Sequence, residues 1–525
     1  MRQSIVRRAT LLLALAASSA GAQSAHVLTP AELQSLDAYV EHAKQQWGSD
    51  VPGLSLAIVQ GDSVVYTKGY GVREVGKPER VDAHTLFAIG SNTKSMTAAL
   101  VGMLVDDGKM RWDDAAWTYL PGFRVADPYV SREATIRDLL SHRTDVENNL
   151  SVWYRSPLSR AQLLERLRFL KQEGSFRSHF LYNNLMVMTA GEAAAAVAGR
   201  PWEELLRQRL FTPLGMRESL TSSRELTPAS DVAAPHMQFD GALVAVPHVD
   251  ASNIGPAGSV YSNAVDMAQY LRLQIGHGVY RGTRLVSDAS VAQMRTVTTP
   301  IGTWQATVPD SDVTVAGYGL CWLIESFRGH RLIRHNGSID GYLADMQVLP
   351  DDRIGVVVLT NQMTRPLPEA IVNHVLDVAL GLRPRDWNGE AVARAKAQDA
   401  QVAARARAQQ TPQSQSAAGV GPMLPLERYA GTYSDSLRGD VTIRLADGKL
   451  VLAYHPGLTA TLEPLRYNTF RLAWQRPNVY ANGTSLATFT VDDMGRPTDV
   501  TVNVMGTFHA AAPSRGARTV SSGQQ

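Results

Sequence analysis

Residues 87–97 read FAIGSNTKSMT and place Ser91 three positions before Lys94. Apolar residues recur at helical spacing between positions 96 and 104, so we expect Ser91 to open a helix. Positions i and i+3 lie on one face of a helix, which puts the Ser91 hydroxyl beside the Lys94 ammonium. A desolvated lysine has a lowered pKa and can help to deprotonate a neighbouring hydroxyl. The pair therefore predicts an activated serine.

The surrounding sequence favours this interpretation over the ordinary alternative, an N-cap serine followed by a surface lysine. Residues 51–71 predict two strands joined by a turn at Gly61 and Asp62, so the pair lies at a strand-to-helix transition. The chain contains no Gly-x-Ser-x-Gly and no His-Glu-x-x-His motif, so an α/β-hydrolase or a zinc hydrolase lacks its parts. Acyl transfer through a serine and a lysine needs neither metal nor cofactor, and we expect none.

The composition excludes one class of partner. The chain has 525 residues, 44% of them apolar, which predicts two or three globular domains. Lysine and arginine number 51 against 49 aspartate and glutamate, a net charge of +2. This balance gives no electrostatic basis for binding nucleic acid or an anionic membrane surface.

The first residues have the pattern of a secretory signal. A basic start is followed by an apolar run from Thr10 to about Ala17 and by the small residues 20–22. We expect cleavage near Ala22 and export to the periplasm or the medium. An uncleaved anchor is the alternative, although the apolar run is short for a membrane span and no later run is long enough for one.

Composition changes along the chain predict its division into domains. Residues 28–385 mix strand and helix signals, 386–424 read as a helical and flexible linker, 425–513 as a small all-β domain and 514–525 as a disordered tail. The single cysteine, Cys321, lies in an apolar run and is expected to be a buried structural thiol.

Five segments make a family resemblance specific. In chain order they are VPGLSLAIV, FAIGSNTKSMTAALVGMLVDDGKM, TIRDLLSH, LYNNLMVMTAGE and HNGSIDGY. In order and spacing they resemble the serine β-lactamase and penicillin-binding-protein family over residues 30–385, most of all the branch of class C β-lactamases, D-aminopeptidases and esterases. The resemblance implies an α/β (α+β) β-lactamase-like fold with a mainly antiparallel sheet, flanking helices and a helical subdomain. It further implies that Ser91 is the acylated nucleophile and Lys94 its partner in proton transfer.

The second motif of the family is Tyr-x-Asn, which begins in this chain at Tyr182, Tyr261 and Tyr480. Tyr182 alone precedes a predicted helix at the position the resemblance requires. We expect nearby cations to lower its pKa so that it accepts the Ser91 proton and returns it to the leaving group. Asn184 would then hydrogen-bond Lys94 and the substrate. The ordinary alternative is a buried tyrosine.

The third motif is Lys-Thr-Gly in β-lactamases and reads His335-Asn336-Gly337 in this chain, on an expected edge strand. His335 would orient substrate, but with a charge that depends on pH, which argues against strong β-lactamase activity. Gly337 would allow close approach of substrate, and the N–H groups of Ser338 and Ser91 would form the oxyanion hole. A solvated strand histidine before a turn glycine is the alternative. His142 is expected to be structural.

The C-terminal domain resembles the lipocalin-like appendage of many such hydrolases, which can cap the site or hold subunits together as a homo-oligomer. We therefore expect an exported serine hydrolase that acts on amides or esters such as D-residue peptides. Two alternatives stay open: a class C-like β-lactamase, and a binding protein for penicillin or cell-wall peptide that does not hydrolyse its ligand.

Overall fold

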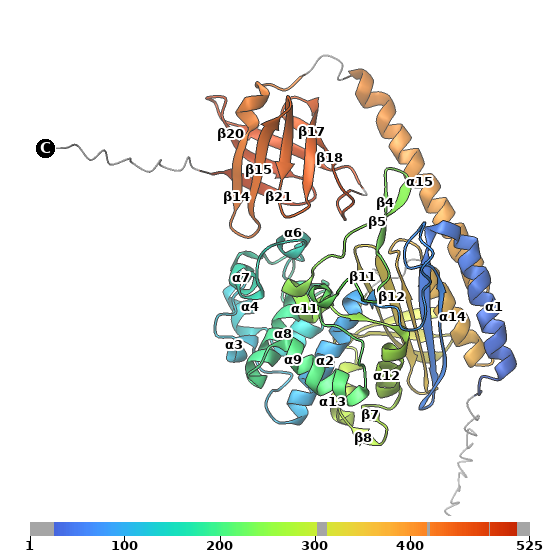
Figure 1. The fold of residues 1–525 in the computed structure, drawn as a ribbon. Helices are drawn as coiled ribbons and strands as arrows, with labels where there is room; N and C mark the ends of the chain where they lie inside the picture. The colour runs from blue at the N-terminus through green and yellow to red at the C-terminus, as the bar shows by residue number, and fades with distance from the viewer. Residues whose placement is uncertain (1–25, 302–311, 417–420, 482, 512–525) are drawn as a thin grey trace, which may run out of the picture.

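The computed structural model describes residues 26–301, 312–416, 421–481 and 483–511. The predicted signal peptide and C-terminal tail lie outside these residues. Figure 1 shows a larger body in which helices flank a sheet, and a smaller β-barrel above it. The long helix α15 (Trp387–Ser416) runs from the base of the larger body toward the barrel (Figure 1). The predicted fold class, with a separate small β domain, is confirmed.

The larger body is built on an antiparallel sheet. Within the described residues it has seven strands in the order β2-β1-β13-β12-β11-β10-β9. The predicted hairpin is β1 and β2, and Gly61 takes the positive φ that its turn requires. The strands are β1 (Gly53–Gln60), β2 (Ser63–Gly71), β9 (Val313–Tyr318), β10 (Leu323–Phe327), β11 (His330–Ile339), β12 (Tyr342–Leu349) and β13 (Ile354–Thr360).

Strand β11 is not the edge strand that the sequence suggested, because β12 and β10 flank it. Its pairing with β10 ends at Arg334, however. In the described part of the chain, residues 335–339 pair only with β12, so this half of β11 has a free edge. The free edge faces the segment that carries Ser91, since Gly337 packs against Ile89 and Ser91.

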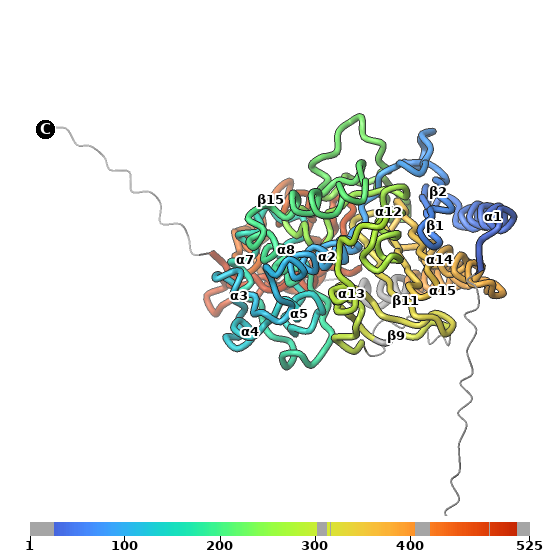
Figure 2. Tube along the Cα trace, turned by 90° about the horizontal axis from the view of Figure 1, so that it is seen from below, coloured from blue at the N-terminus to red at the C-terminus, as the bar shows by residue number. Residues whose placement is uncertain are grey.

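Helices cover both faces of the sheet. The amphipathic helices α1 (Pro30–Trp47) and α14 (Leu367–Ala379) pack with α15 on one face, where their apolar residues form a core with β1 and β13 (Figure 2). On the other face lie α12 (Ala264–Ile275) and α2 (Thr93–Asp106). Every residue of α2 from Thr93 to Leu104 is buried, as expected for a helix enclosed by its neighbours.

The helical part beside α2 contains the predicted helix α8 (Asn184–Ala198), which begins at the N-cap Asn183 and ends at Gly199 in the left-handed conformation. The remaining helices are α3 (Ala116–Tyr119), α4 (Pro128–Glu133), α5 (Ile136–Leu140), α6 (Leu150–Trp153), α7 (Arg160–Arg166), α9 (Trp202–Leu206), α10 (Thr212–Leu214), α11 (Gly255–Gly258) and α13 (Asp288–Met294). Short strand pairs are β3 (Phe87–Ala88) with β6 (Tyr261–Ser262), β4 (His236–Phe239) with β5 (Ala242–Ala245), and β7 (Val279–Tyr280) with β8 (Thr283–Arg284).

The C-terminal domain is a closed antiparallel barrel. Its first predicted hairpin, around Asp447 and Gly448, joins β15 to β16, and both turn residues have the positive φ that two-residue hairpins favour. The strands are β14 (Gly431–Asp435), β15 (Gly439–Ala446), β16 (Lys449–Ala453), β17 (Thr459–Arg466), β18 (Thr469–Trp474), β19 (Leu486–Val491), β20 (Pro497–Val502) and β21 (Gly506–Ala510).

The barrel sits on the segment around α6 (Figure 1). The Tyr454 hydroxyl donates to the Ser151 carbonyl at 2.8 Å, and His455 donates to the Tyr154 carbonyl at 3.1 Å. The aromatic rings of Tyr154 and Tyr480 pack edge to face across the same junction. None of the helices in the described ranges is long and apolar enough to cross a membrane.

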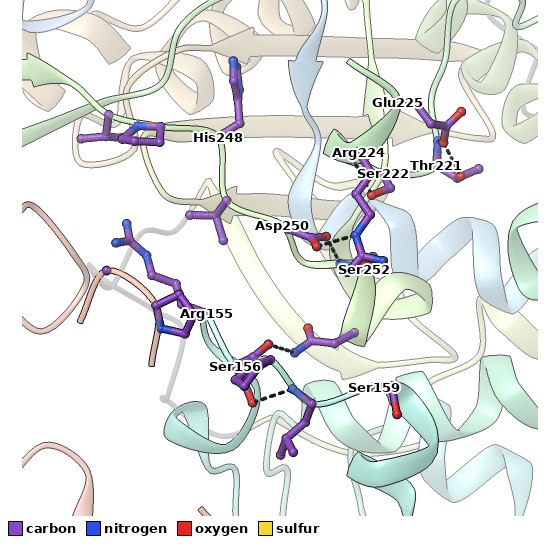
Figure 3. Close-up of a pocket in the computed structure, with 18 of the residues that line it drawn as sticks. Arg155, Ser156, Ser159, Thr221, Ser222, Arg224, Glu225, His248, Asp250 and Ser252 are labelled. Atoms are coloured by element: carbon purple, nitrogen blue, oxygen red, sulfur yellow. Dashed lines mark hydrogen bonds and ion pairs between the residues drawn. The ribbon is translucent and has the colours of Figure 1, made fainter. Parts of the chain in front are cut away.

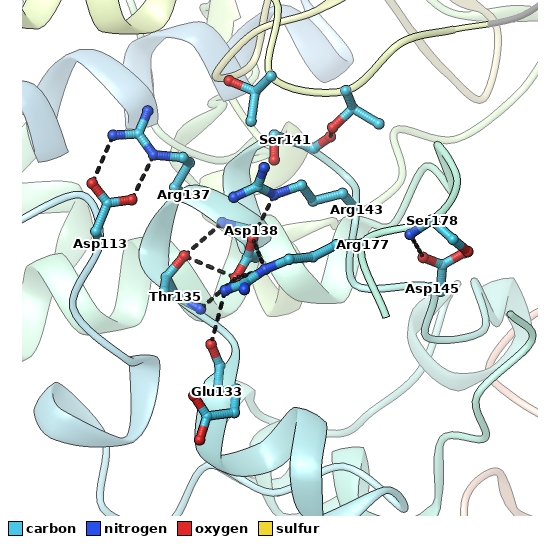
Figure 4. A network of polar contacts seen from close by, with 12 residues as sticks. Asp113, Glu133, Thr135, Arg137, Asp138, Ser141, Arg143, Asp145, Arg177 and Ser178 are labelled. Carbon is cyan, nitrogen blue, oxygen red and sulfur yellow. Dashed lines mark hydrogen bonds and ion pairs between the residues drawn. The ribbon is translucent and has the colours of Figure 1, made fainter. Parts of the chain in front are cut away.

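A buried carboxylate, that of Asp138, fixes the start of α5. Asp138 accepts hydrogen bonds from Arg143 at 2.5 Å and Arg177 at 2.7 Å, and it forms a capping box with Thr135 (Figure 4). Burial opposes ionisation of Asp138, but the hydrogen bonds from Arg177 and Thr135 and the charge of Arg143 outweigh it, so its pKa is lowered.

Asp138→Asn should lower the free energy of unfolding at pH 7 by about 1–3 kcal/mol, because it leaves Arg143 and Arg177, which are only partly buried, without their carboxylate. Because the pKa of Asp138 is lower in the folded chain than in the unfolded chain, its ionised carboxylate stabilises the fold at pH values above the unfolded-state pKa. This contribution to the free energy of unfolding is lost as the pH falls through the folded-state pKa. The difference between wild type and variant in urea unfolding should therefore be largest near neutral pH and shrink below about pH 4.

The matched control is Asp113→Asn. Asp113 pairs with Arg137 in the same region, but its side chain is 64% exposed (Figure 4). Its loss should cost less than about 1 kcal/mol. Equal effects of the two substitutions would contradict the claim that the buried carboxylate of Asp138 fixes the start of α5.

Candidate active site

Ser91 and Lys94 lie side by side, as the sequence predicted. Ser91 sits in a 3₁₀ turn (Gly90–Asn92) that leads directly into α2, rather than in α2 itself. The fully buried Lys94 Nζ is 2.8 Å from Ser91 Oγ. It also donates to Asn184 Oδ1 at 2.7 Å and to the carbonyl of Ala257 at 2.6 Å. The role of Ala257 was not predicted, because a backbone acceptor leaves no motif in the sequence.

The environment of Lys94 favours the neutral amine. Burial lowers its pKa from the usual value of a lysine to about 7. The oxygens of Asn184 and Ala257 can only accept, so they take both N–H groups of a neutral amine. The lone pair of Nζ is then left to face the Ser91 hydroxyl. This arrangement suits a base that takes the Ser91 proton near neutral pH.

Tyr182 approaches Ser91 from the segment before α8. Its hydroxyl is 2.7 Å from Ser91 Oγ, and Lys94 Nζ lies 4.8 Å from the centroid of its ring. The expectation that cations lower the pKa of Tyr182 is wrong, because burial dominates and raises this pKa. Tyr182 is therefore a protonated phenol at neutral pH that donates to Ser91 Oγ.

The other Tyr-x-Asn segments lie elsewhere. Tyr261 is in β6 and packs against Tyr342. Tyr480 belongs to the barrel, where it packs on Trp474, and Asn482 lies outside the described residues. Tyr182 is the member of the three candidates that the structure brings to Ser91.

His335 is buried near Tyr182, with 6.4 Å between the ring centroids. Its Nδ1 faces the Asn336 carbonyl, which can only accept, so Nδ1 carries the proton. Nε2 therefore accepts from the hydroxyl of Tyr318 at 2.9 Å. Burial lowers the pKa of His335 to about 3, so the imidazole is neutral over the working range of most enzymes. Tyr318 matches no motif and was not predicted.

Backbone segments meet closely around Ser91. A Cβ atom on Gly337 would lie 1.9 Å from the Ile89 carbonyl oxygen and 2.7 Å from the Ser91 nitrogen. A Cβ atom on Gly90, whose φ is positive, would lie 2.8 Å from the Ser338 nitrogen. Only glycine fits either position. The backbone nitrogens of Ser91 and Ser338 thus belong to segments in close contact, and the oxyanion hole that their N–H groups would form stays a prediction.

His142 fixes the backbone on both sides of Tyr182. Its carbonyl accepts from the Leu181 N–H at 2.8 Å, and its Nδ1 accepts from the Asn183 N–H at 3.1 Å. Its ring packs against the Tyr182 ring at 4.3 Å between centroids. Cys321, a buried thiol as predicted, lies behind this group, and burial raises its pKa to about 12.

Comparison with protein-family models identifies both domains. Residues 36–381 match the Beta-lactamase family, which confirms the predicted resemblance. Residues 415–515 match a domain of unknown function, DUF3471. The lipocalin-like description of the barrel and the domain boundaries stay predictions.

Three curated relatives of the chain are named as hydrolases or penicillin-binding proteins. "Unguisins hydrolase ungD" of Aspergillus violaceofuscus is 27% identical over 76% of this chain and 75% of its own length. "Penicillin-binding protein 4" of Amycolatopsis lactamdurans is 31% identical over 59% of this chain and 81% of its own. The "D-alanyl-D-alanine-carboxypeptidase/endopeptidase AmpH" of Escherichia coli is 25% identical over 70% and 93% respectively.

Solved structures share the fold. The octameric penicillin-binding protein homologue from Pyrococcus abyssi has a TM-score of 0.59 and 22% identity, and the match covers 91% of this chain and all of that one. The D-amino acid amidase from Ochrobactrum anthropi, in complex with D-phenylalanine, has a TM-score of 0.55 and 20% identity over 68% of this chain and 99% of its own.

The pKa of Lys94 predicts how the reactivity of Ser91 depends on pH. Deprotonated Lys94 predominates above pH 7, so the rate constant for labelling by a fluorophosphonate should rise with pH, with a midpoint near pH 7. Lys94→Arg should remove this rise and slow labelling by about 10²-fold or more.

The control variant is Lys109→Arg, which changes an exposed lysine just beyond the same helix and should leave the pH profile unchanged. A flat profile in the wild-type protein between pH 5 and 9 would contradict the role of Lys94 as the base.

Proposed function

The chain belongs to the Beta-lactamase family, a family with hydrolases among its members, and from this premise we propose that it is an exported serine hydrolase that forms an acyl-enzyme at Ser91. One observation carries the proposal. Ser91 Oγ lies between the amine of Lys94 at 2.8 Å and the phenol of Tyr182 at 2.7 Å. A hydroxyl held between a base and a donor is equipped for nucleophilic attack.

In the first half of the reaction, Lys94 Nζ takes the Ser91 proton as Oγ bonds to the substrate carbonyl carbon. The carbonyl oxygen becomes an oxyanion, which the N–H groups of Ser91 and Ser338 stabilise. Tyr182 gives its proton to the leaving nitrogen or oxygen as the bond to carbon breaks. The Lys94 ammonium then gives its extra proton to the phenolate of Tyr182. Both side chains are neutral again, and the products of this half are the acyl-enzyme and a free amine or alcohol.

In the second half, water replaces the leaving group. Its proton passes to the Lys94 amine as its oxygen bonds to the acyl carbon, and the proton returns to Ser91 Oγ as the ester breaks. Asn184 holds Lys94 in place through both halves, since its Oδ1 accepts from Nζ at 2.7 Å.

The substrate class follows from His335. A neutral imidazole offers no charge to a substrate carboxylate, unlike the lysine of Lys-Thr-Gly, and the single N–H of His335 is already donated to the Asn336 carbonyl. This favours peptide amides and esters over β-lactams, which carry a carboxylate. The endopeptidase activity in the printed name of the Escherichia coli relative, D-alanyl-D-alanine-carboxypeptidase/endopeptidase, supports D-residue peptides cleaved at an internal amide as substrates.

Two finer points belong to the same proposal. Export rests on the signal-like pattern of residues 1–22. A homo-oligomer held through the barrel is consistent with the octameric relative from Pyrococcus abyssi, whose fold is shared.

The test is hydrolysis of D-alanine p-nitroanilide, its L-counterpart, p-nitrophenyl acetate and a chromogenic cephalosporin. We expect turnover of the D-anilide and the ester to exceed that of the cephalosporin. Ser91→Ala should abolish it, and Tyr182→Phe should lower kcat by about 10²–10⁴-fold, because a proton donor is lost.

Tyr261→Phe is the matched control, since it removes a hydroxyl from another buried tyrosine of a Tyr-x-Asn segment. It should retain wild-type kcat. Hydrolysis that survives Ser91→Ala would exclude the proposed nucleophile, and fast turnover of the cephalosporin alone would favour the β-lactamase alternative.

A further inference from the structure

A large cavity lies where the barrel meets the larger body (Figure 3). Its volume is about 1230 Å³, more than a single amino-acid side chain could fill. Segments 155–161, 221–225 and 244–250 of the larger body line it, and barrel loops close it with Pro456, Gly457, Arg476 and Pro477. Figure 3 shows Arg155, Ser156 and Ser159 on one side and Arg224, Ser222 and Thr221 on the other.

None of the candidate catalytic residues lines the cavity, but two residues of its wall are linked to the segments that hold them. Arg155, which lines it, donates to Asp340 at 2.7 Å, and Asp340 follows Ser338 by two residues of chain, or about 7 Å. Asn253 also lines it and precedes Ala257, the acceptor of Lys94, by four residues. A substrate that extends along the free edge of β11 from Ser338 toward Asp340 therefore runs toward the wall of this cavity.

The direction along β11 determines which part of the substrate points toward the cavity: the acyl arm, which is the part on the acyl side of the bond that breaks, or the leaving group. Tyr182, the proposed donor to the leaving group, lies with His335 at the other end of the free edge. The end toward Asp340 is therefore left for the acyl arm.

Most charges on the cavity wall are compensated. The arginines of the larger body each pair with carboxylates: Arg155 with Asp340, Arg160 with Glu192 and Glu203, Arg207 with Glu225, and Arg224 with Asp250. Arg476 of the barrel is exposed and forms no ion pair with any residue that the structure describes. It leaves the cavity with an uncompensated positive charge.

We propose that this cavity binds the acyl arm of a peptide substrate several residues long, and that Arg476 pairs with a carboxylate on that arm. The proposal rests on the hydrolase function proposed above. It makes the barrel a part of the substrate site that determines specificity.

The test uses D-alanine p-nitroanilide with and without an acyl extension of three residues that contains either glutamate or glutamine. In the wild-type protein the glutamate peptide should have a KM about 10-fold below that of the glutamine peptide, since a charge-assisted hydrogen bond forms. Arg476→Glu should raise KM for the glutamate peptide by about 10-fold or more.

Arg471→Glu is the matched control, because it makes the same charge change at an exposed barrel position that does not line the cavity. It should change neither KM. Calorimetric binding of the glutamate peptide to Ser91→Ala, with and without Arg476→Glu, measures the same contact without turnover. Equal affinities of the proteins with and without Arg476→Glu would overturn the cavity proposal and leave the hydrolase function standing. If the affinities differ but the wild-type protein turns over none of these substrates, the hydrolase function alone would be contradicted.

Discussion

The active-site architecture depends on a buried amine, Lys94, beside which no carboxylate lies in the part of the chain that the structure describes. A charged ammonium in this position would be expensive, so burial shifts its equilibrium toward the neutral form and brings its pKa to about 7. The oxygens of Asn184 and Ala257 satisfy its N–H groups and leave its lone pair for Ser91. The same burial that makes Lys94 costly therefore makes it a base.

Holding this amine requires segments far apart in the chain. The turn before α2 supplies Ser91, the start of α8 supplies Asn184, and α11 supplies the carbonyl of Ala257. The glycines at 90 and 337 let β11 close against that turn without side chains between them. Asp138 and His142 support the site from behind, the first through α5 and the second through the backbone on either side of Tyr182.

Local patterns in the sequence predicted much of this arrangement. The i and i+3 spacing put Ser91 beside Lys94, the order of the motifs along the chain separated Tyr182 from Tyr261 and Tyr480, and paired turn signals predicted the barrel hairpins. A following helix alone would not have separated them, because α12 begins just after Tyr261. The predictions that failed concern properties that depend on burial in the tertiary structure. The pKa of Tyr182 is raised rather than lowered, because desolvation outweighs the hydrogen bond with Ser91. The contact of His335 with Tyr318, the partial pairing of β11 and the cavity at the barrel all arise from segments that no local pattern brings together.

The most direct measurement is intact-protein mass spectrometry after an acid quench of the reaction with a D-alanyl ester, followed by peptide mapping. We predict one D-alanyl group per folded chain, on the peptide that contains Ser91, and none on Ser91→Ala. An adduct on another residue, or hydrolysis by the folded wild-type protein that persists in Ser91→Ala without any acyl-enzyme, would contradict the assignment of Ser91 as the nucleophile.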